Sequence, residues 1–468
     1  MAEVRDELVA AVDAVAEHLA GIRDRPVWQP VPEADRAWLT GQELPEAGRP
    51  LGALVDDVRS RVMAHPMGNG HPRFFGWVNS APSPAGILVE PMAAALNPSC
   101  AGGEHAGTLL ERSVVRWLAE LVGFPHAPGG GLLTSGASMA TIIALAAARQ
   151  RTAREDGWDV REEGLHGRAP MVLYVSAEGH SCLRKAAELL GLGNRQVRVV
   201  PIDAECRMDV AALRSMVAQD VAAGLRPCCV AASAGTVNTG AIDPLDAIAD
   251  VAAEHGLWFH VDGAYGALGV LAEGSAARYA GLARADSVAL DPHKWLGVPV
   301  DCGCVLLRDP ALARDAFSLV PAYLRDEGAG DLGWFSEYGP EQTRPFRALR
   351  AWATMAHLGR AGIVELVERT IALANAFAEL IERSADFTLV APVTTSIVAF
   401  RFGPPGTGDE LNRAIPAAVQ RRGRAFLTGT RIGGAEALRA CFINPATTPE
   451  DLETLLDEIR LVARTGDR

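Results

Sequence analysis

From about residue 110 onward, short apolar runs alternate with segments of helical periodicity. Nearly all-apolar runs of this kind are typical of strands that are buried on both faces of a sheet. Because helices separate the runs, the strands are expected to run mainly parallel. The runs are 171–177, 197–203, 228–235, 258–264, 287–291 and 302–308. The sequence therefore predicts an α/β domain built on a mainly parallel sheet.

The two ends of the chain have a different character. Residues 1–73 combine an amphipathic helix with a proline-containing, loop-like stretch that has little core of its own. We expect this segment to pack on another body, such as a partner subunit. Residues 74–350 carry the α/β pattern, and residues 351–468 read as a small α+β unit with a long helical stretch at its start. These are the three expected domains.

Composition excludes several classes of function. The net charge is -13 and there is no basic run, which argues against binding to nucleic acid or to an anionic membrane. No apolar run reaches the ~20 residues that cross a bilayer, and acidic residues interrupt the N-terminal helix, unlike a signal peptide. The eight cysteines show no C-x-x-C spacing. We expect reduced, buried thiols, a cytoplasmic protein and no metal site.

Lysine is almost absent: of 44 basic residues, only Lys185 and Lys294 are lysines. Arginine fills most surface roles equally well, but it keeps its proton and cannot form an imine with an aldehyde. Lys185 follows an arginine on a predicted amphipathic helix, which indicates an ordinary surface position. Lys294 follows a buried strand and precedes Trp295 and Leu296, where an apolar environment favours a nucleophilic, uncharged amine. Lys294 is therefore the candidate for covalent chemistry.

Three further segments place potentially functional residues at the end of a predicted strand or at the start of a predicted helix. Asp262 ends a buried strand, a position typical of a cap, a metal ligand or a carboxylate that holds a proton on a pyridine ring. Residues 134–141 open a helix whose N-terminal amides favour an anion, although an ordinary N-cap is the simpler interpretation. His180 follows a strand; such a histidine is usually structural, but in a cofactor site it would stack on a ring or transfer a proton.

Together these motifs resemble the group II pyridoxal 5′-phosphate (PLP)-dependent amino-acid decarboxylases, such as the aromatic-L-amino-acid, tyrosine, tryptophan, histidine and glutamate decarboxylases. The most specific part is HVDGAYG (260–266) followed by DPHKWLG (291–297). The other segments that carry the resemblance are 71–84, 108–125, 131–141, 178–186, 233–245, 321–324 and 344–352. The resemblance implies fold type I, the aspartate aminotransferase type. It also implies a homodimer whose N-terminal segment wraps the partner, and a lyase of amino-acid, hence carboxylic acid, metabolism.

The resemblance assigns roles by position. Lys294 would be the Schiff-base lysine and Asp262 the partner of the pyridinium nitrogen. His180 would stack over the ring, and Ala264 would lie beneath it. Tyr323, on a closing loop and from either subunit, would protonate Cα after carbon dioxide leaves. The full set of implied cofactor contacts is Ala137, Ser138, His180, Thr236, Asp262, Ala264, His293 and Lys294.

The substrate side departs from the family pattern. Val237 stands where many relatives have a second threonine, and residues 77–79 replace the Tyr-Phe-Pro run of aromatic decarboxylases. The substrate contacts that we expect are Phe75, Trp77 and Thr108. Since aromatic side chains are available and no basic cluster marks an acidic substrate, we expect an aromatic or apolar L-amino acid.

The implied activity is decarboxylation of an L-amino acid to its amine and carbon dioxide. Some relatives couple decarboxylation to oxidative deamination and form aldehydes, and these typically replace the loop tyrosine or the stacking histidine. Tyr323 and His180 are both present here, which favours the amine. An aminotransferase, in which Arg439 would bind the substrate carboxylate, and a catalytically inactive PLP-fold scaffold also stay open.

Overall fold

In the computed structural model, residues 2–319, 332–404 and 408–465 are described, and the chain divides into two compact units. The larger unit comprises Val78–Asn375 and Ala391–Val398, and the smaller one comprises Met1–Trp77, Ala376–Val390 and Ala399–Arg468. These units are defined by internal contacts, so the expected division at residues 73 and 350 stays a prediction. Among the described residues, no helix has the length and apolarity that crossing a membrane would require.

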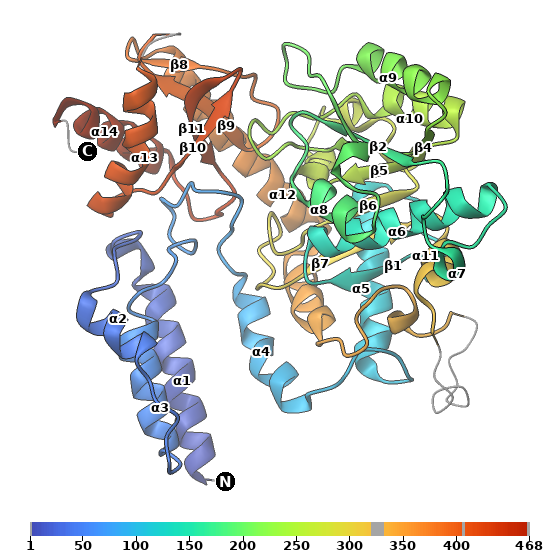
Figure 1. Cartoon of the computed structure of the whole chain (residues 1–468). Helices are drawn as coiled ribbons and strands as arrows, with labels where there is room; N and C mark the ends of the chain where they lie inside the picture. The colour runs from blue at the N-terminus through green and yellow to red at the C-terminus, as the bar shows by residue number, and fades with distance from the viewer. Residues whose placement is uncertain (1, 320–331, 405–407, 466–468) are drawn as a thin grey trace. The chain divides into compact units, whose positions relative to one another are not determined.

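A seven-stranded sheet forms the centre of the larger unit, with the order β1-β7-β6-β5-β4-β2-β3 (Figure 1). Only β7 runs antiparallel to its two neighbours, so the expectation of a mainly parallel sheet is confirmed. The strands are β1 (Gly131–Thr134), β2 (Met171–Ser176), β3 (Val197–Val200), β4 (Arg226–Ser233), β5 (Trp258–Asp262), β6 (Ser287–Leu290) and β7 (Gly303–Leu307).

Helices bury both faces of this sheet. In β2, Leu173 and Val175 point into the core that α6 (Ala137–Glu155) fills with alanine and isoleucine. Tyr174 points to the opposite face, where its hydroxyl donates to Asp220 of α9 (Val210–Ala222) over 2.9 Å. Because successive strand residues alternate between faces, strands covered on both sides must be apolar throughout. This explains the uninterrupted apolar runs in the sequence.

Helical segments account for most of the remaining larger unit. The other helices are α4 (Pro84–Leu96), α5 (Ala106–Val122), α7 (Val160–Glu163), α8 (Cys182–Leu189), α10 (Leu245–His255) and α11 (Pro310–Phe317). Among the described residues of this unit, the short 3₁₀-helical segments are Asn194–Gln196, Gly266–Leu271, Ala276–Tyr279, Leu282–Arg284 and Phe335–Glu337. The long helix α12 (Arg347–Glu382) begins in the larger unit and ends in the smaller one.

The strand order gathers the motif residues at one edge of the sheet. Because β7 alone is reversed, strands β1, β2, β4, β5 and β6 all end at this edge. Asp262, at the end of β5, pairs with Ser233 at the end of β4 and with Ala289 of β6. In open α/β sheets, ligands bind outside the carboxyl ends of the strands. A ligand-binding site is therefore expected in the loops that follow these strands.

The smaller unit contains a four-stranded antiparallel sheet with the order β10-β11-β9-β8. Its strands are β8 (Phe387–Leu389), β9 (Ile397–Phe402), β10 (Thr428–Ile432) and β11 (Ala435–Cys441). Its helical segments are α1 (Ala2–Ala20), Ile22–Asp24, α2 (Glu33–Thr40), α3 (Leu51–Asp57), the π-helical turn Val58–Val62, α13 (Asp409–Arg422) and α14 (Pro449–Thr465). The strand β9 begins with two residues that belong to the larger unit.

The structure differs from the sequence pattern in a few places. The N-terminal stretch expected to be loop-like contains α2 and α3, and its Pro32 and Pro50 lie at the starts of these helices, where proline is tolerated. The long helical stretch is interrupted at Gly359, which has φ 62°. Strands β1, β10 and β11 have no marked apolar alternation, and the sequence pattern does not identify them.

Candidate active site

Lys294 lies in a tight turn directly after β6. Its amide donates to the carbonyl of Asp291 over 2.8 Å, and its carbonyl accepts from the amide of Gly297 over 3.1 Å. Gly297 has φ 66°, and a Cβ atom there would lie 2.8 Å from the carbonyl oxygen of Ala81. The turn therefore requires glycine. It holds the lysine backbone at the carboxyl edge of the sheet.

The residue after the lysine anchors this turn in the core. Trp295 is 1% exposed and stacks on Tyr265, with ring centroids 5.1 Å apart. Its indole nitrogen donates to the hydroxyl of Thr370 over 2.9 Å. The Lys294 side chain is 23% exposed, whereas Lys185 lies on the surface of α8. The amine of Lys294 is thus largely shielded from solvent but still accessible to a ligand. The prediction that Lys185 is an ordinary surface residue is confirmed.

Asp291 joins the lysine to the start of α6. One carboxylate oxygen, Oδ2, lies 3.0 Å from the Lys294 Nζ atom. The other oxygen, Oδ1, accepts from the amide of Ala137 over 2.7 Å. The Asp291 side chain is only 4% exposed. A single buried carboxylate therefore bridges the amine and the N-terminus of the helix.

The N-terminus of α6 is built from small residues. Its N-cap is Gly136, whose carbonyl accepts from the amides of Met139 and Ala140 over 3.0 and 3.1 Å. A Cβ atom on Gly303, the first residue of β7, would lie 2.4 Å from the Gly136 Cα atom, so the two backbones are in direct contact. Ser138 is exposed at this end of the helix. Such an N-terminus, with its positive dipole end, favours an anion.

His293 is a neutral hydrogen-bond donor toward the same region. Its Nδ1 atom accepts from the amide of Cys302 over 3.1 Å, so the proton is assigned to Nε2. Burial is the main cause that lowers the pKa of His293, and the nearby Asp291 charge opposes this effect. The Nε2 atom lies 3.7 Å from Asp291 Oδ2. The ring can therefore offer one N–H group to an anion beside α6.

Asp262 and Ala264 occupy the neighbouring strand end. Asp262 is 7% exposed, and its Oδ1 atom accepts from the amide of Ala264 over 3.2 Å. The Ala264 carbonyl accepts from the amide of Asp291, which ties this loop to the lysine loop. Burial, together with the charge of Asp262, raises the pKa of the Cys182 thiol to about 12, and the charge of Lys294 opposes this shift. The carboxylate, the lysine and this protonated thiol therefore share one electrostatic environment.

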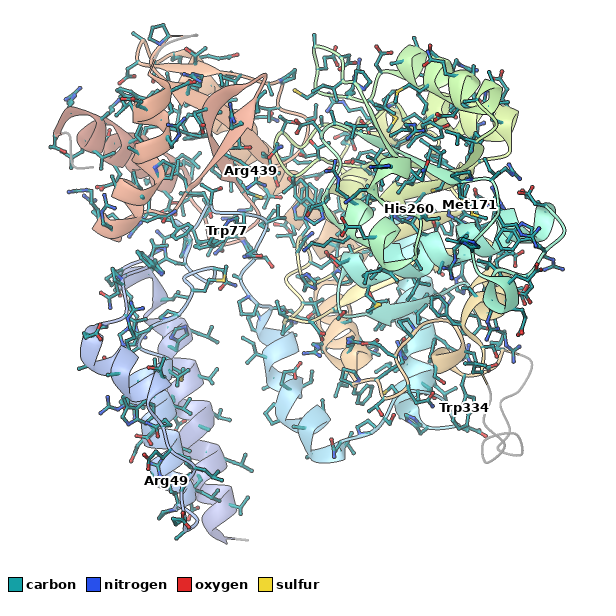
Figure 2. All side chains as sticks on the ribbon, in the orientation of Figure 1. Arg49, Trp77, Met171, His260, Trp334 and Arg439 are labelled. Atoms are coloured by element: carbon teal, nitrogen blue, oxygen red, sulfur yellow. The ribbon has the colours of Figure 1, made fainter. Side chains whose placement is uncertain are left out.

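His260 lies inside the larger unit (Figure 2). It precedes Asp262 by two residues in β5, so the two side chains lie on the same face of that strand. Its Nδ1 atom is 2.8 Å from the hydroxyl of Ser287, which also accepts from the Trp258 indole nitrogen. Burial lowers the pKa of His260 to about 4, against the opposing effect of Asp262. The ring is therefore neutral near pH 7 and leaves the Asp262 carboxylate without a cationic neighbour on this side.

His180 follows β2 and is exposed. Its Nδ1 atom accepts from the amide of Cys182 over 3.2 Å, which assigns the proton to Nε2. The loop that carries it is tied down by Glu178, whose carboxylate accepts from the side-chain amide of Asn238 over 2.9 Å. His180 therefore presents an N–H group or a ring face from a loop that is held at a defined position.

Two threonines of the expected site form hydrogen bonds through their hydroxyl groups with nearby groups of the protein. The Thr236 hydroxyl lies 2.9 Å from that of Thr239 and accepts from the amide of Ala241 in a buried turn after β4. The Thr108 hydroxyl donates to the carbonyls of Gly103 and His105 at the start of α5. Thr236 lies at the carboxyl edge of the sheet, whereas Thr108 lies on a different element. The roles expected for both residues stay predictions.

The remaining expected residues belong to the smaller unit or lie outside the described residues. Phe75 is 1% exposed and packs against Phe442, with ring centroids 5.2 Å apart. Trp77 is exposed, and its carbonyl accepts from the buried Arg439 guanidinium over 2.9 Å (Figure 2). Tyr323 lies outside the described residues. Its role, and the substrate contacts of Phe75 and Trp77, stay predictions.

The described residues fit PLP as a cofactor. PLP carries an aldehyde, a phosphate and a ring nitrogen, and it needs an amine, an anion site and a carboxylate to match them. Lys294 and the start of α6 are linked through one side chain, and Asp262 is buried at the adjacent strand end. Small residues, Gly136 and Ala264 among them, leave the backbone open to a flat molecule. The chemistry of this set of groups matches the cofactor.

One residue at the centre of this site is not assigned a role by the sequence motifs. Asp291 belongs to the DPHKWLG segment, but only the structure shows its contacts with both Lys294 and Ala137. A signal was present, since Asp291 directly follows a buried strand and Asp262 is the last residue of another. The link to Ala137, 154 positions away, depends on the strand order and cannot be read from local periodicity.

Comparison with known proteins gives a consistent picture. The family model described as the pyridoxal-dependent decarboxylase conserved domain matches residues 32–403. The aromatic-L-amino-acid decarboxylase of Bacillus atrophaeus is 31% identical, over 98% of this chain and 95% of the relative. The L-2,4-diaminobutyrate decarboxylase of Rhizobium meliloti is 33% identical, over 90% of this chain and 84% of the relative.

Two further similarities bear on cofactor and product. The crystal structure of Oryza sativa TDC with PLP and tryptamine has a TM-score of 0.92 and 26% identity, and the match covers 100% of this chain and 99% of that one. The 4-hydroxyphenylacetaldehyde synthase of Rhodiola rosea is 27% identical, over 96% of this chain and 92% of the relative. Similarity therefore extends along the whole chain and includes proteins that are named for different substrates and products.

Proposed function

Because the chain belongs to the pyridoxal-dependent decarboxylase family, we propose that Lys294, Asp262 and the N-terminus of α6 form its cofactor site. The fold is fold type I, and the activity is the PLP-dependent decarboxylation of an amino acid. The observation that carries the site assignment is the single carboxylate, Asp291, that joins the Lys294 amine to the first amide of α6. It places an amine and an anion site side by side.

The residues around the amine hold and orient the reactants. Lys294 would supply the amine that bonds to the cofactor aldehyde and that the substrate amine would displace. The amides of Ala137 and Ser138 and the Nε2–H group of His293 hold the phosphate. When bound, PLP acts as an electron sink that weakens a bond to the substrate Cα atom. Which bond breaks depends on how the protein orients the substrate.

Asp262 and His180 control charge and protons at the ring. The buried carboxylate of Asp262 holds a proton on the ring nitrogen, because a cation beside a buried carboxylate is strongly favoured. His180, with its proton on Nε2, would lie against the ring of the bound cofactor and would donate to the substrate. Thr236 and Ala264 complete the contact surface, and Thr108 contacts the substrate. In this proposal Tyr323 returns a proton to Cα once carbon dioxide has left.

We expect the product to be an amine rather than an aldehyde. The residues whose replacement typically accompanies aldehyde formation, Tyr323 and His180, are both present. Purified holoenzyme supplied with its substrate is expected to release amine and carbon dioxide in equal amounts, with no hydrogen peroxide. The Tyr323→Phe variant, which lacks the proton-donating hydroxyl, is expected to shift the product toward aldehyde and ammonia, with dissolved dioxygen as the oxidant that is reduced to hydrogen peroxide. Quantifying amine, carbon dioxide, aldehyde and ammonia by mass spectrometry, and hydrogen peroxide by a peroxidase assay, measures this.

The same assay distinguishes the other reactions that this fold supports. Aldehyde, ammonia and peroxide as the main products of the unmodified enzyme would overturn the amine assignment. Transfer of the amino group to a keto acid without carbon dioxide release would favour an aminotransferase. An absence of any reaction despite bound PLP would favour an inactive scaffold.

The proposed substrate is an aromatic or apolar L-amino acid, and Phe75 and Trp77 are proposed to contact it. A panel of amino acids that includes L-2,4-diaminobutyrate tests this proposal by carbon dioxide release. We expect release from aromatic or apolar members of the panel. Release from L-2,4-diaminobutyrate alone would contradict the proposal.

We also propose a homodimer that includes the N-terminal segment. Helix α1 exposes an apolar stripe, in which Leu8, Val9 and Val12 are each more than half exposed. Helix α4 of the larger unit likewise exposes Leu88 and Leu96. Contiguous exposed apolar surface usually marks an interface. The family resemblance supports covering this surface with a second copy of the chain.

The dimer proposal predicts the effect of a single charge. Placing a carboxylate on the stripe with Val12→Glu is expected to convert a dimer of two 49.4 kDa chains to a monomer, since a buried unpaired charge is costly. Sedimentation velocity measures the change. Ala10→Glu is the matched control, because Ala10 is exposed on the other side of α1 and should leave the dimer intact. A wild-type chain that sediments as a monomer would contradict the proposal.

A cytoplasmic location is proposed on the state of the cysteines. All eight are buried and none forms a disulfide. Burial also keeps several thiols protonated: it raises the pKa of Cys100 to about 11. A reducing compartment is where free thiols persist. Recovery of the chain in the soluble cytoplasmic fraction of cells is the expected result, and recovery in an exported fraction would contradict it.

A further inference from the structure

The carboxylate of Asp291 occupies the position that the proposed phosphate anchor needs. Its Oδ1 atom accepts from the amide of Ala137, the first residue of α6, over 2.7 Å. Its Oδ2 atom forms an ion pair with the Lys294 Nζ atom at 3.0 Å. Both partners are groups that the proposed function assigns to the cofactor. A negatively charged residue therefore holds both the amide and the amine that the cofactor has to use.

The other amides at this end of α6 offer little in exchange. The amides of Met139 and Ala140 both donate to the Gly136 carbonyl. Within the described part of the chain, the amide of Ser138 donates to no acceptor. If Asp291 kept its contact with Ala137, a bound anion could accept from only one amide of the helix, that of Ser138, and would lie beside a carboxylate. An anion that displaced Asp291 would gain the Ala137 amide as well.

Electrostatics favours displacement over coexistence. The Asp291 side chain is 4% exposed, so water screens its charge poorly from a phosphate at the same helix end. Gly136 lies close by: a Cβ atom there would be 3.7 Å from Asp291 Oδ1 and 3.5 Å from the Cε1 atom of His293. Because the atoms around Gly136 pack closely, the Asp291 carboxylate and a bound anion would compete for the same position at the N-terminus of α6.

We infer that the Asp291 carboxylate competes with the cofactor phosphate for the N-terminus of α6, and so weakens cofactor binding. This inference rests on the proposed cofactor site. When the cofactor binds, the Ala137 amide gives up Asp291 and donates to the phosphate instead. The Lys294 amine likewise gives up its ion pair with Asp291 and bonds to the aldehyde. Occupancy of the enzyme then follows the concentration of free cofactor, and inorganic phosphate acts as a competitor.

The test replaces the carboxylate with its neutral isostere. Asp291→Asn keeps an oxygen that can accept from Ala137 but removes the charge. We expect the dissociation constants of PLP and of inorganic phosphate to fall by at least about ten-fold, because a repulsive buried charge is removed. Titration calorimetry on protein stripped of cofactor measures both constants. A residue with a merely structural role would give unchanged or weaker binding.

Two companion variants separate competition from other causes. Asp286→Asn is the matched control, because Asp286 precedes β6 as Asp291 follows it and also accepts a backbone amide, that of Phe259, over 2.7 Å. It should leave both dissociation constants unchanged. Asp291→Ala removes the competing oxygen without adding a donor, so it should also bind phosphate more tightly. Tighter binding by the asparagine variant alone, with a folded alanine variant that binds more weakly, would overturn the inference.

Failure of the inference and failure of the cofactor site give different results. Borohydride reduction with PLP followed by peptide mapping identifies the bonded lysine, and the chain has only two lysines, Lys185 and Lys294. Labelling of Lys294 together with unchanged phosphate binding in Asp291→Asn would reject the competition and leave the site standing. Labelling of Lys185 alone would reject the proposed site itself.

Discussion

Replacing Lys294 with alanine is expected to lower kcat/KM for decarboxylation by at least about a thousand-fold, because the variant has no amine to bond to the cofactor or to exchange with the substrate. The backbone of Lys294 is held in a turn fixed by Gly297 and by the buried Trp295. Among the described residues the other lysine, Lys185, lies on the surface of α8. Carbon dioxide release measures the loss.

The control and a spectroscopic measurement make the result specific. Lys185→Ala removes the same functional group from an exposed helix position and should keep wild-type activity. The visible absorbance of the bonded cofactor should disappear in Lys294→Ala and persist in the control. Circular dichroism should be the same for all three proteins. Activity of Lys294→Ala within ten-fold of wild type would reject the assignment of this lysine.

The second large effect is expected at Asp262. Replacing it with asparagine removes the negative charge but keeps the size, so the ring nitrogen loses the partner that holds its proton. We expect the transition state to lose about 4 kcal/mol of stabilisation, a loss similar in size to the cost of removing one partner of a buried ion pair. A loss of this size lowers kcat by about a thousand-fold. The neutral His260 behind Asp262 cannot replace the lost charge. Single-turnover kinetics with bound cofactor measures the chemical step directly.

The comparison with a conservative variant distinguishes charge from structure. Asp262→Glu restores the carboxylate, and we expect it to recover part of the lost kcat even though its longer side chain is displaced. Both variants should retain the covalent bond between PLP and Lys294, because that bond depends on the amine. Equal activity of the asparagine variant and the wild type would show that the ring nitrogen needs no anionic partner here. Loss of cofactor from both variants would assign Asp262 a structural role instead.

The order of strands and helices could be predicted because it is a local property of the sequence. Runs such as 258–264 are apolar at nearly every position, which already indicates a strand buried on both faces. The structure places helices on both sides of these strands, as expected. Strand β1, with only four residues, and the pair β10–β11 lack such a pattern. Their positions depend on pairing with distant partners.

In the candidate site, too, the residues marked by local sequence features could be predicted, whereas their tertiary contacts could not. Lys294 and Asp262 are marked by chemistry and by their places after buried strands, and the structure brings both to one edge of the sheet. The interactions of Asp291, and the tautomers of His180 and His293, require contacts that no motif encodes. The structure also shows that the Thr108 hydroxyl is bonded to its own helix start.

The amino-acid sequence alone shows which amine is available, that Asp262 ends a buried strand, and that the strands are buried on both faces. These features follow from residue type and from local periodicity, which are fixed before the chain folds. The contacts of Asp291 with both Lys294 and Ala137 arise only when the chain folds. Strand β7 lies between β1 and β6 and brings together loops that are far apart in the sequence. Contacts of this kind depend on strand order, which is set by the packing of the whole sheet rather than by any one segment.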